Sequence, residues 1–353
     1  ALQHAILGPA VSSGFAVRYQ PASRPLQVGG DWYDVVDLDD GRIGLIVGDC
    51  VGHGLGAATI MGQLRSAFRA LLLEHPSPAA ALSAVDRFAV RLPGARCTTA
   101  SCAVLSPDTG EVVYPSAGHP PPILVHSDRS RDLLDGAQAT PLGVACDRPR
   151  PEAHATIPPR ATLLLYTDGL VERRREAIDE GIARAADVME DNGATTLDDM
   201  AKMIMSGLAP HDGYQDDVAL LLYRQPAPLE LDMIADVGEL APSRAALRGW
   251  LTRAGVKADQ TLDVLIATGE ALANAIEHGH RHSTGGAVGS VTLRAFALAD
   301  RLHVTVVDTG TWKAPVAAAH RGRGIALMRG LMHDVTIEPD AGGTTVHLRA
   351  RIA

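Results

Sequence analysis

The stretch "GLIVGDCVGHGLGAATIMGQL", residues 44–64, contains the features that decide how the rest of the chain is interpreted. An apolar run typical of a β-strand ends at Asp49, and a helical pattern begins a few residues later. Four glycines lie within nine residues, at positions 48, 52, 54 and 56. A carboxylate and a glycine-rich turn at the end of a strand suit either a nucleotide-binding loop or a metal ion held at the strand end.

Length and composition limit the classes of protein to consider. A chain of 353 residues predicts two domains, and 46% hydrophobic with 21% charged residues is typical of globular cores. The net charge of −9 argues against a nucleic-acid partner, and no apolar run reaches the roughly 18 residues that span a bilayer. Four cysteines without a CxxC motif predict neither a zinc site nor a disulfide framework, so the cytoplasm is the expected location. The first residue is Ala and not Met, which suggests a fragment.

The segment "QPAPLE", residues 225–230, predicts a linker between a first domain at 1–224 and a second at 231–353. Short β-type runs alternate irregularly with helical patterns before it, at 56–74, 77–91, 172–190 and 197–208. After it, helices at 242–254 and 259–279 come first, followed by strands and a helix at 322–332. Neither half has the strict alternation of a doubly wound parallel sheet, so we expect an α+β protein.

Aspartates recur at the ends of predicted strands in the first half. Asp49 and Asp168 stand where "IGLIVGD" and "TLLLYTD" stop, and Asp216 and Asp217 stand where "VALLLY" starts. If that last strand is antiparallel to the others, all four carboxylates gather at one edge of a sheet. Each one alone would be an ordinary turn residue, but the repeated match favours a common site.

The segment "GGDWYD" adds Asp31 and Asp34 at the entrance of another strand. Clustered carboxylates cannot all stay ionised without a cation, and such oxygen ligands are those preferred by Mg²⁺ and Mn²⁺. Gly48 and Gly52 are then expected to let the backbone approach the ion. The sequence therefore favours the metal site over the nucleotide loop.

Five motifs of the first half, "VGGDWYD", "GDCVGHG", "SAGHPPPIL", "LLLYTDGLVE" and "QDDVALLL", resemble the successive motifs of metal-dependent PPM-type serine/threonine phosphatases. The most similar branch is that of SpoIIE and RsbU, bacterial regulators of sigma-factor partner switching. The resemblance spans nearly all of residues 1–224. It implies an α/β/β/α sandwich with two Mn²⁺ or Mg²⁺ ions between the sheets.

By this resemblance, Asp31 and Asp49 hold one metal ion, with Asp49 bridging to a second ion held by Asp168 and Asp216. The main-chain carbonyl of Cys50 lies where the family uses a backbone oxygen. The implied mechanism is in-line attack on phosphoserine or phosphothreonine by a water that the two ions activate. No cysteine nucleophile is needed.

Three neighbouring residues receive lesser roles. Asp217 is expected to act in an outer shell around the metal ions, and Asp34 to orient the turn. His53 is expected to pack or to form hydrogen bonds, because a hard cation site does not favour imidazole.

The second half contains a different set of polar residues. In the helix "TLDVLIATGEALANAIEHGH", an apolar stripe is expected from Leu262, Leu265, Ile266, Leu272 and Ile276. Glu270 and Asn274 are four residues apart and share one face of this helix. Asp308 and Gly310 follow a strand, Gly322 and Gly324 open a helix whose N–H groups suit phosphate, and Thr344 and Thr345 stand in "AGGTTVHL".

In order and spacing this set resembles the ATPase fold of histidine kinases, gyrase and Hsp90, and most closely the anti-sigma-factor serine kinases of the SpoIIAB and RsbW kind. The resemblance covers about residues 229–353. It implies a smaller two-layer α/β sandwich of the histidine-kinase-like (Bergerat) fold that binds ATP with Mg²⁺.

Carried over by motif, Asn274 holds Mg²⁺ and Glu270 acts as general base. Asp308, Gly310 and Thr345 are expected to contact the adenine end of ATP. Gly322 and Gly324 are expected to contact its phosphates. The family often has DxGxG, whereas this chain has Trp312 at the last position, so ATP binding is better supported than phosphate transfer.

These features predict a protein-serine/threonine phosphatase fused to an anti-sigma-type serine kinase domain. The expected partner is a small phosphoserine/phosphothreonine anti-sigma-factor antagonist, with a sigma factor as a second partner class. No nucleic acid or membrane is expected, and a homodimer stays open. Two alternatives also stay open: a phosphatase regulated by a non-catalytic ATP-sensing domain, and an ATP-dependent protein that binds a sigma factor or antagonist without turnover.

Overall fold

The computed structural model describes residues 14–22, 29–38, 41–75, 77–254, 256–279, 289–298, 301–310, 323–340 and 342–352. The chain forms two compact units, Ala1–Gln225 and Pro226–Ala353. Both units combine helices with antiparallel sheets, as the α+β prediction requires. Among the described residues, no helix has both the length and the apolar character needed to cross a bilayer.

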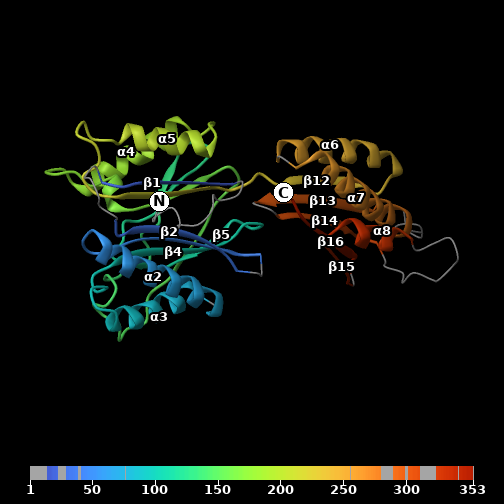
Figure 1. The fold of residues 1–353 in the computed structure, drawn as a ribbon. Helices are drawn as coiled ribbons and strands as arrows, with labels where there is room; N and C mark the ends of the chain where they lie inside the picture. The colour runs from blue at the N-terminus through green and yellow to red at the C-terminus, as the bar shows by residue number, and fades with distance from the viewer. Residues whose placement is uncertain are drawn as a thin grey trace. The chain divides into compact units, whose positions relative to one another are not determined.

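The first unit is built on two antiparallel sheets (Figure 1). One has the order β1 (Phe15–Gln20), β11 (Val218–Arg224), β10 (Thr162–Tyr166), β7 (Ile123–Val125) and β8 (Arg131–Leu133). The other has the order β2 (Asp31–Asp37), β3 (Ile43–Asp49), β4 (Thr99–Ser106), β5 (Glu111–Tyr114) and β9 (Ala153–Thr156), with β6 (Ser116–Ala117) beside β4. The central strands β3, β10 and β11 are almost wholly buried, because each sheet is covered on both faces.

Helices cover the outer face of each sheet. In Figure 1, α4 (Ile178–Asp191) and α5 (Leu197–Gly207) lie outside the sheet that contains β1, and α2 (Leu55–Glu74) and α3 (Pro78–Arg91) lie outside the sheet that contains β2. This is the α/β/β/α sandwich expected from the sequence. The start of α3 shows why a helix begins there: the Ser77 side chain accepts a hydrogen bond from the N–H of Ala80, and Pro78 suits the first helical position.

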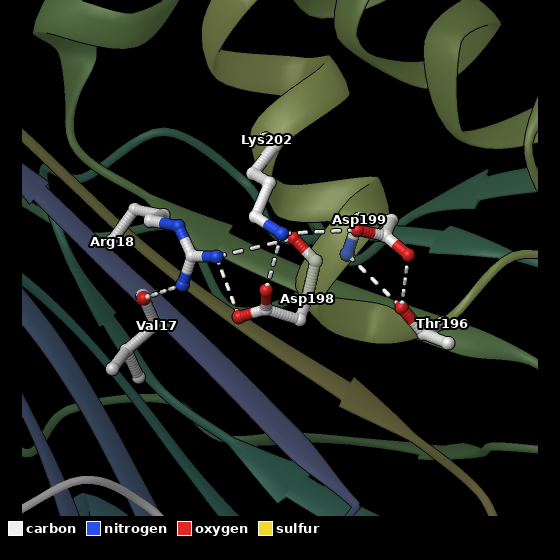
Figure 2. Close-up of polar contacts among 6 residues, drawn as sticks. All are labelled: Val17, Arg18, Thr196, Asp198, Asp199 and Lys202. Atoms are coloured by element: carbon white, nitrogen blue, oxygen red, sulfur yellow. Dashed lines mark hydrogen bonds and ion pairs between the residues drawn. The ribbon is translucent and has the colours of Figure 1, made fainter.

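Polar contacts fix α5 on the edge strand β1, as Figure 2 shows. Arg18 of β1 pairs with Asp198 at 2.5 Å, and Lys202, one turn further along α5, pairs with the same carboxylate at 2.8 Å. Thr196 caps the helix by accepting a hydrogen bond from the N–H of Asp199 at 3.2 Å. The start of α5 is therefore positioned by both its cap and an ion pair to the sheet.

The helix predicted at 172–190 begins later, at Ile178. The chain instead makes a 3-10 turn, η1 (Asp168–Leu170), whose carbonyl groups are occupied by Arg173. The same guanidinium binds the Leu208 carbonyl and lies over the Tyr214 ring. Because Arg173 satisfies these groups, the segment after Asp168 is stable without continuing as a helix.

The second unit has a single antiparallel sheet in the order β12 (Leu229–Ile234), β13 (Ser290–Leu298), β14 (Arg301–Asp308), β16 (Thr344–Arg351) and β15 (Asp334–Pro339). The helices α6 (Leu240–Arg253), α7 (Ala258–Gly279) and α8 (Arg323–Leu331) pack on one face (Figure 1), and a 3-10 turn, η2 (Val237–Glu239), precedes α6. In β14 the alternate residues Leu302, Val304 and Val306 are buried. This alternation is typical of a two-layer sandwich with one solvated sheet face.

The structure differs from the predicted linker at 225–230. Gln225 belongs to the first unit, because its N–H binds the Ala161 carbonyl and its side chain donates to the Pro107 carbonyl at 2.7 Å. Leu229 already belongs to β12, so a strand and not a helix opens the second unit.

The apolar stripe predicted for α7 is only partly correct. Leu265, Leu272 and Ile276 are buried, but Leu262 and Ile266 are 55% and 37% exposed. The inner face is filled by smaller residues that the pattern did not single out: Val264, Ala267, Ala271 and Ala275. These small side chains let α7 lie close to the sheet. Leu262 and Ile266 are exposed because they lie on the outer face of the helix.

Candidate functional site

A row of polar side chains crosses the second sheet of the first unit. Asp31 of β2 lies directly opposite Asp49 of β3, and Asp49 lies directly opposite Thr99 of β4. Side chains of paired residues project from the same face of a sheet, so these three lie side by side. Asp31 is only 2% exposed.

The other sheet contributes Asp168 and Asp216. β10 and β11 are antiparallel, with Tyr166 opposite Leu220. The pairing continues beyond β10, because Thr167 donates its N–H to the Ala219 carbonyl at 3.0 Å and accepts from the N–H of Ala219 at 2.8 Å through its hydroxyl. The end of β10 and the start of β11 thus lie together, as the antiparallel argument predicted. The carboxylates nevertheless come from two facing sheets, and not from one sheet edge.

The acid–base properties of these carboxylates indicate that they are neighbours. Burial, followed by the charge of Asp49, raises the pKa of Asp31 well above its ordinary range. Burial also raises the pKa of Asp49, and the charges of Asp168 and Asp216 contribute in the same direction. The pKa of Asp168 is raised by burial, then by Glu172 and Asp216. The charge of Asp49 on Asp31, those of Asp168 and Asp216 on Asp49, and that of Asp216 on Asp168 thus make ionisation of the affected carboxyl group less favourable, whereas the hydrogen bond from Asp31 lowers the pKa of Asp49.

The donor atoms suit a hard divalent cation. The Oδ2 atom of Asp31 is buried and has no hydrogen-bond partner. Gly30 lies so close to the Cys50 carbonyl that a Cβ on Gly30 would stand 2.5 Å from that oxygen. Within the described ranges, no three His, Cys, Asp or Glu side chains already stand close enough to hold a metal ion. Ionised carboxylates repel one another, and a bound divalent cation would offset this repulsion.

Asp217 is buried and supports the neighbouring backbone. Its carboxylate accepts hydrogen bonds from the N–H of Ala22, at 2.8 Å, and from the N–H of Gly30. Gly30 precedes Asp31, so Asp217 positions the entrance of β2. The N–H of Asp217 in turn donates to Asp216 at 2.8 Å.

Asp34 lies on the opposite face of β2 from Asp31, because the two are three residues apart in a strand. Its carboxylate accepts hydrogen bonds at 3.0 Å from both Arg65 and Arg69 of α2. Asp34 therefore fixes α2 against the sheet, and the expected role of orienting the turn is replaced by this one.

Two expectations around the glycine-rich loop are wrong. His53 is exposed and so has no packing role; it lies near Asp217, whose pKa its charge lowers. Gly48 faces the Trp32 ring, 2.2 Å from where its Cβ would stand, so it makes room for an indole and not for an ion. Gly52 has φ 93°, which explains a glycine there by backbone conformation.

The cysteine nearest the cluster is not a nucleophile. Burial raises the pKa of the Cys50 thiol to about 12, so the thiolate is scarcely present at neutral pH.

Sequence reasoning missed His119, which lies in the quoted motif "SAGHPPPIL". Its ring is buried, with Nδ1 2.8 Å from the Thr99 hydroxyl and Nε2 2.9 Å from the Tyr166 carbonyl. Burial lowers its pKa to about 4, so the imidazole is neutral at physiological pH. The signal available in the sequence was a histidine followed directly by three prolines in this motif.

In the second unit, three of the predicted nucleotide-site residues lie together. Glu270 and Asn274 project from one face of α7 toward the start of α8. A Cβ on Gly324 would stand 2.6 Å from Oε2 of Glu270 and 3.6 Å from Nδ2 of Asn274. A side chain at position 324 would have to displace the end of the Glu270 side chain.

Asp308 ends β14 and is buried, and its Oδ1 accepts a hydrogen bond from the N–H of Gly310 at 2.8 Å. Thr345 pairs with Val307, and Thr344 pairs with Asp308. Because side chains alternate along a strand, Thr344 shares the buried face of Asp308 and Thr345 projects from the other face. This placement does not support the adenine role given to Thr345. Gly322 and Trp312 lie outside the described residues.

Comparison with known proteins agrees with both halves of this description. Residues 39–226 match the family described as Stage II sporulation protein E (SpoIIE), and residues 233–350 match the histidine kinase-like ATPase domain. Phosphoserine phosphatase RsbP of Bacillus subtilis (strain 168) is 25% identical over 187 residues, which are 52% of this chain and 45% of RsbP. Serine-protein kinase RsbW of Bacillus pumilus (strain SAFR-032) is 31% identical over 117 residues, 29% of this chain and 72% of RsbW.

The chain thus spans about half the length of RsbP. A crystal structure of the RsbU and RsbW domains of Rv1364c from Mycobacterium tuberculosis matches both units, with a TM-score of 0.58 and 32% identity over 97% of this chain and 94% of that one. The resemblance drawn from the motifs is confirmed. The chain belongs to the Stage II sporulation protein E (SpoIIE) family, with an RsbU/RsbP-like phosphatase domain fused to an RsbW-like histidine-kinase-like ATPase domain.

Proposed function

We propose that the first unit is a metal-dependent phosphatase for phosphoserine and phosphothreonine in proteins. The observation that supports this most strongly is the approach of Asp31, Asp49, Asp168 and Asp216 from two facing sheets, with a buried Asp31 oxygen that has no protein partner. The names of the related phosphatases point to the same activity.

Each of these residues has a defined task in the proposed reaction. Asp31 and Asp49 would hold one Mn²⁺ or Mg²⁺ ion together with the Cys50 carbonyl. Asp49 would also contribute to a second ion, whose other ligands would be Asp168 and Asp216. When bound, the ions supply Lewis acidity that activates water and neutralises phosphate charge. Asp217 holds the backbone before Asp31, so the ligand does not have to be ordered when the substrate arrives.

We propose an ATP site between α7 and α8 in the second unit. Asn274 would hold Mg²⁺, and Glu270 would act as general base on the hydroxyl that receives phosphate. Asp308 and Gly310, together with Thr344 in place of Thr345, would contact adenine, and Gly324 with Gly322 would contact phosphate. The space that a Cβ on Gly324 would fill supports this assignment.

The proposed substrate is a small phosphoserine or phosphothreonine protein of the anti-sigma-factor antagonist class, with a sigma factor as a second partner of the kinase-like unit. The similarity to RsbW supports a partner of this kind. A phosphatase and a kinase domain of this class in one chain would act in opposite directions on the same class of protein, which is the logic of partner switching.

One sequence feature favours a second candidate for the ATPase-like unit. Trp312 stands where related kinases often have glycine. An indole is much bulkier and less flexible than glycine, which favours a unit that binds ATP and regulates the phosphatase without transferring phosphate.

The phosphatase proposal is tested by hydrolysis of p-nitrophenyl phosphate with and without Mn²⁺. Asp31→Asn should lower the rate by at least about 100-fold, as for loss of a catalytic group. Asp34→Asn is a matched control, because Asp34 lies on the same strand but on the opposite face. The folded fraction of this variant, measured by circular dichroism, should retain Mn²⁺-dependent hydrolysis. Equal rates for wild type and Asp31→Asn would disprove the proposed site.

The kinase proposal is tested separately by transfer of radiolabelled phosphate from ATP to a candidate antagonist. Wild type should transfer phosphate, and Glu270→Ala should bind ATP without transferring it. ATP binding by both with transfer by neither would favour the sensor over the kinase.

A further inference from the structure

His119 connects the two sheets of the first unit at the carboxylate cluster. Its Nδ1 atom lies 2.8 Å from the hydroxyl of Thr99 on β4, and its Nε2 atom lies 2.9 Å from the carbonyl of Tyr166 on β10. β4 belongs to the sheet with Asp31 and Asp49, and β10 belongs to the sheet that leads to Asp168. His119 thus joins the two sheets at the candidate metal site, in addition to Asp217, which accepts a hydrogen bond from the N–H of Gly30.

The partners of His119 define its protonation state. A carbonyl oxygen can only accept a hydrogen bond, so Nε2 carries the proton and donates it to Tyr166. Nδ1 then has a lone pair and accepts from the Thr99 hydroxyl. Of the two neutral tautomers, only this one satisfies both ring nitrogens, and the contacts fix the ring orientation at both ends.

Both ends of this link lie beside proposed ligands. Thr99 is the direct cross-strand partner of Asp49, which is the partner of Asp31. Tyr166 is two residues before Asp168, and the intervening Thr167 is held by three hydrogen bonds to Ala219. A continuous path therefore runs from Asp31 through Thr99 and His119 to Asp168.

The loop that carries His119 is itself held in place. The main-chain carbonyl of His119 accepts hydrogen bonds from the Ser116 hydroxyl and from the Gln138 amide, each at 3.3 Å. The N–H of Gly118 also donates to the Ala139 carbonyl. These backbone hydrogen bonds hold the loop in place and so limit movement of the His119 ring between the two sheets.

Resting on the phosphatase function proposed above, we propose that His119 is a positioning residue that sets the separation of Asp49 and Asp168 for cation binding. The described carboxylates stand near one another but not yet in ligating geometry. A fixed spacing of the two sheets limits how far the ligands must move, which favours binding of the pair of ions. The His119 ring has no direct role toward the substrate in this proposal.

The test changes Thr99, because this end of the link can be removed with little loss of volume. Thr99→Val deletes the hydroxyl that donates to Nδ1, and Thr99→Ser retains it. We measure the Mn²⁺ dissociation constant of the full chain by isothermal titration calorimetry without nucleotide. Thr99→Val should bind Mn²⁺ about 10-fold more weakly, the lower end of the usual effect of an outer-shell partner, and Thr99→Ser should restore most of the affinity.

Catalysis is measured alongside binding. With p-nitrophenyl phosphate, Thr99→Val should need a higher Mn²⁺ concentration for half-maximal rate, while kcat at saturating Mn²⁺ recovers toward wild type. A purely structural role would lower the melting temperature and leave the Mn²⁺ dissociation constant unchanged. His119→Gln, whose amide can still donate to Tyr166, should lie between wild type and His119→Ala.

The control is His126→Gln. His126 directly follows β7, and its ring contacts the exposed Asp132 at 2.8 Å. This variant should leave Mn²⁺ affinity unchanged. Wild-type Mn²⁺ affinity in Thr99→Val, equal losses in Thr99→Val and Thr99→Ser, or no Mn²⁺ binding by wild type would each overturn the positioning role. Mn²⁺ binding that depends on Thr99, with no hydrolysis by wild type, would uphold it and refute the phosphatase proposal alone.

Discussion

Replacing His119 by Gln should make the first unit less sensitive to acid. The folded-state pKa of His119 is about 4, below the ordinary value of 6.5, because burial disfavours the imidazolium ion. Below pH 6.5 the unfolded chain binds a proton that the folded chain does not bind until about pH 4, so this site makes stability fall as pH falls. Between about pH 7.5 and about pH 5.5 the loss from this one group is about 1.4 kcal/mol.

The assay is urea unfolding at both pH values, followed by the fluorescence of Trp32, which is fully buried in the first unit. A Trp250→Phe, Trp312→Phe background removes the other two tryptophans of the chain. Other groups titrate in this range too, so the quantity to compare is the pH-dependent change in wild type minus that in His119→Gln. A difference near zero would mean that His119 titrates in the folded protein as it does in the unfolded chain, and would refute a buried neutral imidazole.

Two further substitutions test the energetics and the nucleotide site. Arg150→Met should lower the free energy of unfolding in urea by about 3–5 kcal/mol. The side chain of Asp86 is 1% exposed and pairs with Arg150 at 2.7 Å, so the substitution leaves a buried charge without its partner. As a control, Arg18→Met breaks a surface pair and should lower it by less than about 1 kcal/mol. Gly324→Ala should reduce the rise in melting temperature caused by Mg²⁺–ATP, because the new Cβ would stand 2.6 Å from Oε2 of Glu270 and displace the end of that side chain. An unchanged rise would place the nucleotide elsewhere.

Much of the proposed site follows from local sequence. Asp49 and Asp168 could be predicted as neighbours because each follows an apolar strand, and Asp216 because it precedes one. Glu270 and Asn274 share a helix face by spacing alone. Position along a strand or helix is a local property, so a single sequence contains it.

What the sequence did not predict depends on contacts between distant segments or on the phase of a strand. His119 and Tyr166 are 47 residues apart, and no periodicity connects them. Gly48 makes room for Trp32 on the neighbouring strand, which cannot be inferred from a glycine-rich turn. A shift of one residue decides whether Thr344 or Thr345 shares a face with Asp308, and the motif "GGTT" contains both.

The proposal that four aspartates form a two-cation phosphatase centre depends most on Asp49, whose pKa is affected by each of Asp31, Asp168 and Asp216. The most direct test is to titrate Mn²⁺ into wild type and Asp49→Asn while measuring phosphate release from p-nitrophenyl phosphate. We expect wild type to bind a pair of Mn²⁺ ions and become active, and Asp49→Asn to stay folded, bind Mn²⁺ weakly and remain inactive. A rate in Asp49→Asn above about a tenth of the wild-type rate at saturating Mn²⁺ would contradict the bridging role.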